Sequence, residues 1–145
     1  MNGGLLRMKR RNWLAVGLIA LSALLVGCAQ AATESAEKPA QVQPIAGSKV
    51  SRIILTKEAE GRIGLQTATV QPNSSMPIAA LVYDREGDTW VYTVTGPLTY
   101  VRQHVTVARV VGDTVLLQAG PAPGTSIVTV GAAELLGSEY GVAGE

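Results

Sequence analysis

The chain contains 145 residues, including twelve basic side chains, eleven acidic side chains and one cysteine. Once a leader and a linker are subtracted, this length accommodates one modest domain and is too short for two. A single cysteine excludes a framework of disulfide bonds, so the stability of the fold must come from a hydrophobic core.

The first 28 residues have the order of a secretory signal. Four basic side chains lie within residues 7–11, an apolar segment follows over residues 13–27, and Cys28 comes directly after Gly27. The apolar segment is shorter than the roughly 20 residues that cross a bilayer as a helix. This favours a cleaved signal peptide over a permanent anchor. Residues 25–28, Leu-Val-Gly-Cys, resemble the lipobox of bacterial lipoproteins.

The lipobox resemblance implies cleavage between Gly27 and Cys28 and transfer of a diacylglycerol to the Cys28 thiol. We therefore predict a lipoprotein signal peptide over residues 1–27. The mature protein would be held by lipid on the extracytoplasmic side of a bacterial membrane, in the cell envelope. Ala29 stands where many lipoproteins of the inner membrane carry aspartate, so the inner and the outer membrane both stay open.

Removal of the signal peptide reverses the sign of the net charge. Residues 1–27 hold four basic and no acidic side chains, which leaves 118 residues with eight basic against eleven acidic side chains and a net charge of −3. The remaining residues contain no run rich in lysine or arginine, and so offer no electrostatic footprint for nucleic acid. We expect no nucleic-acid partner.

The segment after the predicted cleavage site has the composition of a linker. Residues 28–48 contain almost no large apolar side chains and include Pro39 and Pro44, which is typical of a flexible chain. We predict a lipidated tether over residues 28–48, one β domain over residues 49–141 and a disordered tail over residues 142–145.

The first half of the predicted domain combines two strands with one helical turn. Apolar and polar residues alternate weakly over residues 50–56 and clearly over residues 65–70, as expected of strands. Between them, residues 57–63 fit a short helix with Thr56 as its N-cap and Gly64 at its end.

The second half is predicted to consist of consecutive antiparallel strands with short turns between them. Turn sequences occur at residues 84–88, at residues 112–113 and at residues 119–124. The predicted strands cover residues 78–83, 89–94, 98–111, 114–118 and 126–130, and a helical turn over residues 132–136 ends at Gly137.

The longest predicted strand, residues 98–111, has one apolar and one polar face. Four valines would line the buried face, and Arg102 and His104 would lie on the opposite face. The four valines are Val101, Val105, Val107 and Val111.

Together these elements predict an all-β fold. The frequent valine, isoleucine and threonine favour strands, and the close spacing of the turns is typical of a small antiparallel β-barrel or sandwich. We expect six or seven strands with one or two short helical turns.

Residues that could bind a metal or catalyse a reaction are scarce. His104 is the only histidine, Met76 is the only methionine after the signal peptide, and Cys28 is predicted to carry lipid, so the usual ligands of zinc, copper and haem are missing. The three acidic residues of the turn at residues 84–88 lack the twelfth-position glutamate of a calcium loop. No nucleophile elbow or catalytic triad is recognisable. We predict no catalytic residue, no metal, no cofactor and no enzymatic activity.

Two regions of the chain carry a resemblance to a known family. The first covers residues 54–58 and 63–70, and the second covers residues 76–82, 90–92, 100–107 and 120–135. They are similar to the opening segment and to the carboxy-terminal, membrane-proximal region of the periplasmic adaptor subunits, or membrane fusion proteins, of resistance-nodulation-division (RND) efflux pumps. Full adaptors carry a biotinyl-lipoyl-like domain, an α-helical hairpin and a β-barrel domain between these regions, where this chain has only the short loop of residues 71–75.

The resemblance implies that the domain docks on the periplasmic face of a transporter. A lipid on Cys28 would hold it near the membrane and raise its effective concentration toward a membrane partner. We predict an RND-type transporter or a full-length adaptor as the partner, with Tyr100, Arg102 and His104 as exposed contact residues. The alternatives are a free-standing structural or ligand-sensing envelope lipoprotein, since fold does not fix function, and a fragment left by gene decay.

Overall fold

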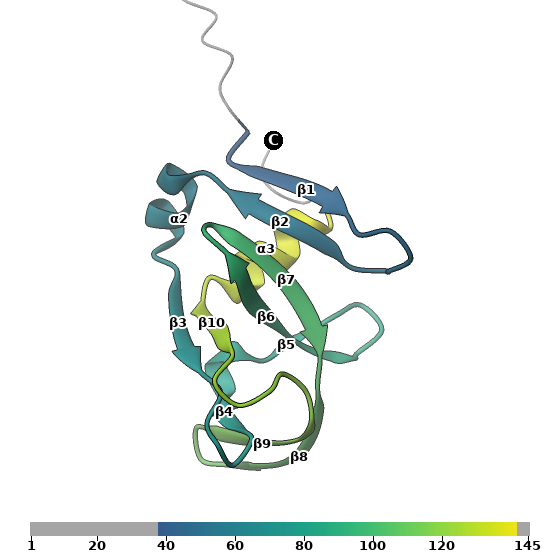
Figure 1. The fold of residues 1–145 in the computed structure, drawn as a ribbon, viewed down its shortest axis with the longest axis vertical. Coiled ribbons are helices and arrows are strands. Elements are labelled where there is room, and N and C mark those ends of the chain that lie inside the picture. Colours follow the sequence, from purple (N-terminus) through teal and green to yellow (C-terminus); the bar gives the residue numbers. More distant parts are fainter. Residues whose placement is uncertain (1–37, 142–145) are drawn as a thin grey trace, which may run out of the picture. The chain divides into compact units, whose positions relative to one another are not determined.

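The computed structural model describes residues 38–141 (Figure 1). These residues form ten strands, two α-helices and one 3-10 helix, and every strand pair among them is antiparallel. The predicted all-β fold is confirmed, although the described residues contain ten strands where six or seven were expected. The predictions for residues 1–27, for Cys28 and for residues 142–145 lie outside the described residues.

Seven strands form the larger sheet in the order β1-β2-β7-β6-β10-β3, and β5 pairs with β6 beside this path. The sheet is open, because β1 and β3 lie at its two ends. The strands are β1 Ala40–Pro44, β2 Ser51–Leu55, β3 Gln66–Thr69, β5 Val82–Tyr83, β6 Thr89–Gly96, β7 Thr99–His104 and β10 Ser126–Val130.

The smaller sheet has three strands in the order β4-β9-β8, which lie together at the lower end of the view in Figure 1. They are β4 Ser75–Pro77, β8 Thr106–Val111 and β9 Thr114–Ala119. The predicted turn between β8 and β9 is present, and Gly112 at its centre has a φ of 56°, a value that glycine adopts without strain. The two sheets do not close into a barrel, and the arrangement is sandwich-like.

Strands β6 and β10 bury both of their faces, which divides the core into two clusters. On one face, Tyr92 and Val128 pack with residues of β2, β7 and helix α3, Ala132–Glu139. On the other face, Val91 and Ile127 pack with residues of the smaller sheet. Burial of each such side chain stabilises the fold by about 1.5–3 kcal/mol. These two strands therefore tie the two halves of the domain together.

Helix α2, Lys57–Ile63, begins and ends as its sequence predicts. The Ala59 N–H donates to Thr56 Oγ1 at 3.1 Å, which satisfies one of the free donors of the first turn. Gly64 ends the helix in the left-handed conformation with a φ of 67°, as glycine commonly does.

The predicted long strand over residues 98–111 is in fact two strands in different sheets. Val105, fully buried, lies between β7 and β8 and redirects the chain from the larger to the smaller sheet. The predicted faces are also wrong, because Tyr100 and Arg102 are buried on β7 and Val111 is 57% exposed on β8. The pattern of valines could not show this break, since alternation continues on both sides of it.

Residues 40–44, which the sequence placed in the tether, form strand β1. It pairs with β2 from Ala40↔Leu55 to Pro44↔Ser51, and the Thr56 N–H donates to Pro39 O at 3.0 Å. Four of its five residues are exposed, so the strand is held by backbone pairing more than by burial. This explains why its composition resembles that of a linker.

Two further elements differ from their predictions. The expected strand over residues 78–83 begins with a 3-10 turn, η1 Ile78–Ala80, and only β5 is extended. Helix α3 does not stop at Gly137 but continues to Glu139. This additional part of α3 places Glu139 against the sheet, where it joins the cluster described below.

Gly131, which precedes α3, lies close to Ile63, and replacing it tests how tightly the chain packs there. Its φ is 92°, and a Cβ atom there would lie 2.6 Å from Ile63 Cγ2. We expect Gly131→Ala to lower the free energy of unfolding by about 2–4 kcal/mol, from overpacking and backbone strain together. Gly61→Ala, in α2 and with open space around it, should raise it by about 0.5–1 kcal/mol. Urea unfolding followed by circular dichroism measures both, and equal effects of the two variants would contradict the packing described.

Candidate functional site

The three predicted contact residues lie on β7, and only one of them faces solvent. Tyr100 is 2% exposed and Arg102 is 8% exposed, whereas His104 is exposed. The prediction that Tyr100 and Arg102 are exposed is therefore wrong. The face of β7 that carries both residues turns toward the core cluster that contains α3, and His104 stays exposed at the end of the strand.

Arg102 is the centre of a buried polar cluster. Its Nε donates to Glu139 Oε1 at 3.1 Å, and its Nη1 donates to the Tyr140 hydroxyl at 3.3 Å. The same Nη1 lies 3.8 Å from Asp84 Oδ2. The guanidinium carbon is 4.5 Å from the centre of the Trp90 ring, a distance at which cation–π attraction operates. Four partners, two from the β5–β6 hairpin and two from the end of α3 and the residue after it, thus surround one charge.

Glu139, on the last turn of α3, is 4% exposed at its side chain. Besides Arg102, its carboxylate accepts from the Tyr92 hydroxyl at 2.7 Å and from the Ser51 N–H at 2.9 Å. These three donors belong to β7, β6 and β2. A single carboxylate therefore joins α3 to three neighbouring strands of the larger sheet.

Asp84 holds the other side of the cluster and the turn between β5 and β6. Its Oδ2 accepts from Trp90 Nε1 at 2.8 Å, and its Oδ1 accepts from the backbone N–H groups of Glu86 and Asp88 at 3.1 and 2.8 Å. The carboxylate is thus directed into its own turn, as is common for aspartate at such positions. The turn predicted at residues 84–88 is present, and Asp84 is its organising residue.

The electrostatics of the cluster favour the charged forms of Arg102 and Asp84. Burial acts to lower the pKa of Arg102, but the charge of Glu139 outweighs it and the pKa is raised. Burial likewise acts to raise the pKa of Asp84, yet the hydrogen bonds from Trp90, Asp88 and Glu86 and the charge of Arg102 lower it overall. Burial, and then the hydrogen bond to Glu139, raise the pKa of Tyr92 far above its usual range. At neutral pH Arg102 and Asp84 are therefore charged, and Tyr92 is neutral.

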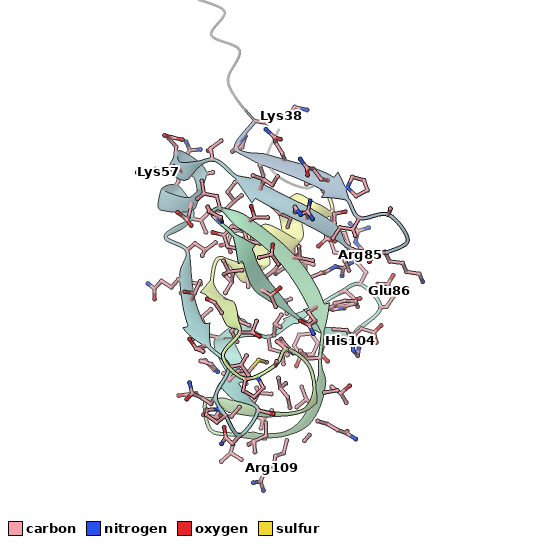
Figure 2. The ribbon with its side chains drawn as sticks, viewed as in Figure 1. Lys38, Lys57, Arg85, Glu86, His104 and Arg109 are labelled. Atoms are coloured by element: carbon pink, nitrogen blue, oxygen red, sulfur yellow. The ribbon has the colours of Figure 1, made fainter. Side chains whose placement is uncertain are left out.

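The outer side of this cluster forms an aromatic surface made by Arg85, Trp90, His104 and Tyr140. The rings of Trp90 and His104 meet edge to face with centroids 5.2 Å apart, and the Arg85 guanidinium lies 4.3 Å from the centre of the Tyr140 ring. Figure 2 shows Arg85 and His104 on the same side of the domain. Trp90 and Tyr140 each contact buried Arg102 and remain partly exposed.

A separate groove of about 450 Å³ lies between the end of α2 and the turn that joins β6 to β7. Leu65, Val94 and Leu98 give it apolar walls, and Glu60 lies within it. Glu60 Oε1 accepts from the Tyr100 hydroxyl at 2.7 Å. Burial, followed by this hydrogen bond, raises the pKa of Tyr100, so the phenol is a neutral donor at physiological pH.

The contacts within the buried cluster hold elements of the fold together. Within residues 38–141, every buried side-chain nitrogen or oxygen has a hydrogen-bond partner. In the same residues, no group of three or more histidine, cysteine, aspartate or glutamate side chains is arranged to hold a metal ion. A fully satisfied network of this kind fixes the positions of its members. Within residues 38–141, no helix has the length and apolar character needed to cross a membrane.

Comparison of the sequence with protein-family models and with curated proteins finds no match. The adaptor resemblance stays a prediction, as do the lipid anchor and the role of His104.

Sequence reasoning missed most members of the buried cluster, which come from four separate parts of the chain. Only two signals were available in the sequence. Trp90 and Tyr92 alternate on one predicted strand, and Glu139 with Tyr140 follows an apolar helical segment. Neither signal reveals that these residues surround Arg102, because Glu139 and Tyr140 lie 37 and 38 positions away from it in the sequence.

Glu139 gives the sharpest test of the cluster. Glu139→Ala leaves Arg102, the Tyr92 hydroxyl and the Ser51 N–H without their acceptor, so we expect the free energy of unfolding to fall by about 3–5 kcal/mol. Glu139→Gln keeps the shape and should have a smaller effect. Glu134→Ala, an exposed change on the same helix, should change it by less than about 1 kcal/mol. Urea unfolding measures the free energy of unfolding of the three variants. Equal losses of this free energy for Glu139→Ala and Glu134→Ala would contradict the account.

Proposed function

We propose that this chain is a non-enzymatic lipoprotein of the bacterial envelope and acts as a truncated, adaptor-like accessory subunit of an RND-type transport complex. The lipid on Cys28 would keep the domain at the membrane, and the domain would dock there on a transporter or on a full-length adaptor. The lipobox resemblance supports the anchor, and the adaptor resemblance supports the class of partner.

The aromatic surface is the observation that supports docking most directly. Tryptophan, tyrosine and arginine are the residue types that dominate the energetics of protein interfaces, and Arg85, Trp90 and Tyr140 lie together with His104 on one side of the domain. Trp90 and Tyr140 are held from beneath by Arg102. Side chains that are already ordered lose less conformational entropy on binding.

The lipid anchor would compensate for the weak binding of so small a surface. A few partly exposed side chains make a weak interface on their own, and confinement to a membrane raises the local concentration of both partners. Stable anchoring takes two signals, such as two or more acyl chains, which a lipidated N-terminal cysteine would provide. The proposal therefore joins a modest docking surface to a strong membrane attachment.

The test is chemical crosslinking in the intact bacterium, followed by purification of the tagged full-length chain from its membranes and mass spectrometry. We expect a transporter or an adaptor to be recovered, and a diacylglycerol on Cys28. An Arg85→Ala/His104→Ala double variant should recover at least tenfold less partner, whereas Arg109→Ala, an exposed change on β8, should recover the same amount. Circular dichroism confirms that each variant folds.

Two outcomes would overturn the proposal. A Cys28→Ala chain that is still processed and membrane-bound would contradict the lipid anchor. Recovery of no transporter and no adaptor, with the wild-type protein abundant and folded, would leave the free-standing envelope lipoprotein as the better interpretation.

A further inference from the structure

The edge strands of the described domain differ in how they are protected. Natural β-proteins prevent unwanted strand pairing with prolines, charged side chains or very short edge strands. Here β1 carries Pro44, β4 carries Pro77, β8 carries the exposed Arg109, and β5 has only two residues. Each of these edges thus has a recognised device against the addition of another strand.

Strand β3 has no such device. Its sequence is Gln66-Thr67-Ala68-Thr69, with neither proline nor charge, and three of its four residues are exposed. β3 pairs with β10 along one side, and within the described residues no strand pairs with its other side. In Figure 1 it runs along the left margin of the domain.

The hydrogen-bond pattern identifies which backbone groups of β3 are directed outward. The Val70 N–H donates to Thr125 O at 2.9 Å, and in an antiparallel ladder the bonded positions alternate. Ala68 is therefore directed toward β10, and Thr67 and Thr69 are directed away from it. In agreement, Thr69 O accepts from the Gln71 side chain at 2.9 Å. The N–H and C=O of Thr67 lie in the middle of the free edge.

The groove described above reaches this edge. Tyr100 and Val94 pair across β7 and β6, and the groove that they line extends to Ser126 of β10 and Thr67 of β3. Glu60 lines the groove, and its Oε1 accepts from the Tyr100 hydroxyl at 2.7 Å. The free edge thus adjoins an apolar hollow that contains one carboxylate.

We propose that the free edge of β3 and the adjoining groove bind an extended polypeptide segment of another protein, which adds to β3 as a further strand. Backbone N–H and C=O groups of the segment would pair with those of Thr67. Alternate apolar side chains would enter the groove, and a basic side chain would lie near Glu60. In this mode of recognition, the main chain supplies affinity and the pockets beside it supply specificity.

The chemistry of the site favours this occupant over a small ligand. The backbone donor and acceptor of Thr67, side by side on a strand edge, are complemented best by another backbone, and the walls of the groove, Leu65, Val94 and Leu98, suit aliphatic side chains. Among the described residues that line the groove, Glu60 is the only charged one, and its carboxylate favours a positive side chain. This site lies apart from the aromatic surface and does not depend on the function proposed above.

The test uses the full chain, purified from membranes in detergent, and a synthetic peptide Lys-Val-Thr-Val-Thr-Val-Thr with blocked ends. We expect saturable binding by fluorescence anisotropy and at least tenfold slower hydrogen exchange of the outward backbone amides of Thr67 and Thr69. A peptide of the same sequence with alternate backbone nitrogens methylated, and one with glutamate in place of lysine, should each bind at least fivefold more weakly.

Variants of this chain separate backbone pairing from side-chain contact. Thr67→Pro removes the outward N–H and should abolish binding, whereas Thr67→Val keeps the N–H and should bind as the wild type does. Glu60→Gln can still accept from the Tyr100 hydroxyl, and it should weaken peptide binding three- to tenfold. This variant keeps the test decisive if Thr67→Pro does not fold. Unchanged exchange of the Thr67 and Thr69 amides at a peptide concentration of about 1 mM, which would saturate a site with a Kd well below 1 mM, would overturn the proposal. So would a dimer of the free chain that Thr67→Pro dissociates, since the edge would then pair with a second copy.

Discussion

The buried ion pair between Arg102 and Glu139 is the interaction on which the rest of the domain depends. Removing two charges from water costs several kcal/mol for each ion, and only close geometry with further hydrogen bonds offsets this cost. The 3.1 Å contact, the Tyr92 hydroxyl and the Ser51 N–H supply those bonds. They also require that β2, β6, β7 and α3 meet at one point. The ion pair therefore selects one arrangement of the larger sheet and its helix, in a domain with no disulfide bond to do so.

The same cluster links the interior to the surface. Trp90 donates to Asp84, and both Trp90 and Tyr140 lie against the Arg102 guanidinium, so the positions of these partly exposed rings are set by buried charges. The groove and the free edge of β3 lie elsewhere and share no residue with this cluster. The domain thus offers an ordered aromatic surface in one place and an open strand edge in another.

Local signals in the sequence predicted the local features of the fold, and residues far apart in the chain determined what was missed. Thr56 and Gly64 delimit α2, and the turns at residues 84–88 and 112–113 are present, because each depends on neighbouring residues alone. Arg102 was placed on the wrong side of its strand, since period-two alternation defines two faces without saying which one is buried. The strand β1 was missed because its stability comes from backbone pairing with β2, which leaves no apolar pattern. The role of Glu139 in α3 could not be predicted, because its hydrogen-bond partners lie on three separate strands, β2, β6 and β7.

The central claim is that the side of the domain organised by Arg102 and Glu139 is the side that docks. The most direct measurement replaces His104, in the full chain in living cells, with the photoreactive residue p-benzoylphenylalanine, and compares its crosslinks with those of the same residue at position 109 on β8. The account predicts a crosslink from position 104 to a transporter or an adaptor and none from position 109. Crosslinks to such a protein from position 109 and none from position 104 would contradict it.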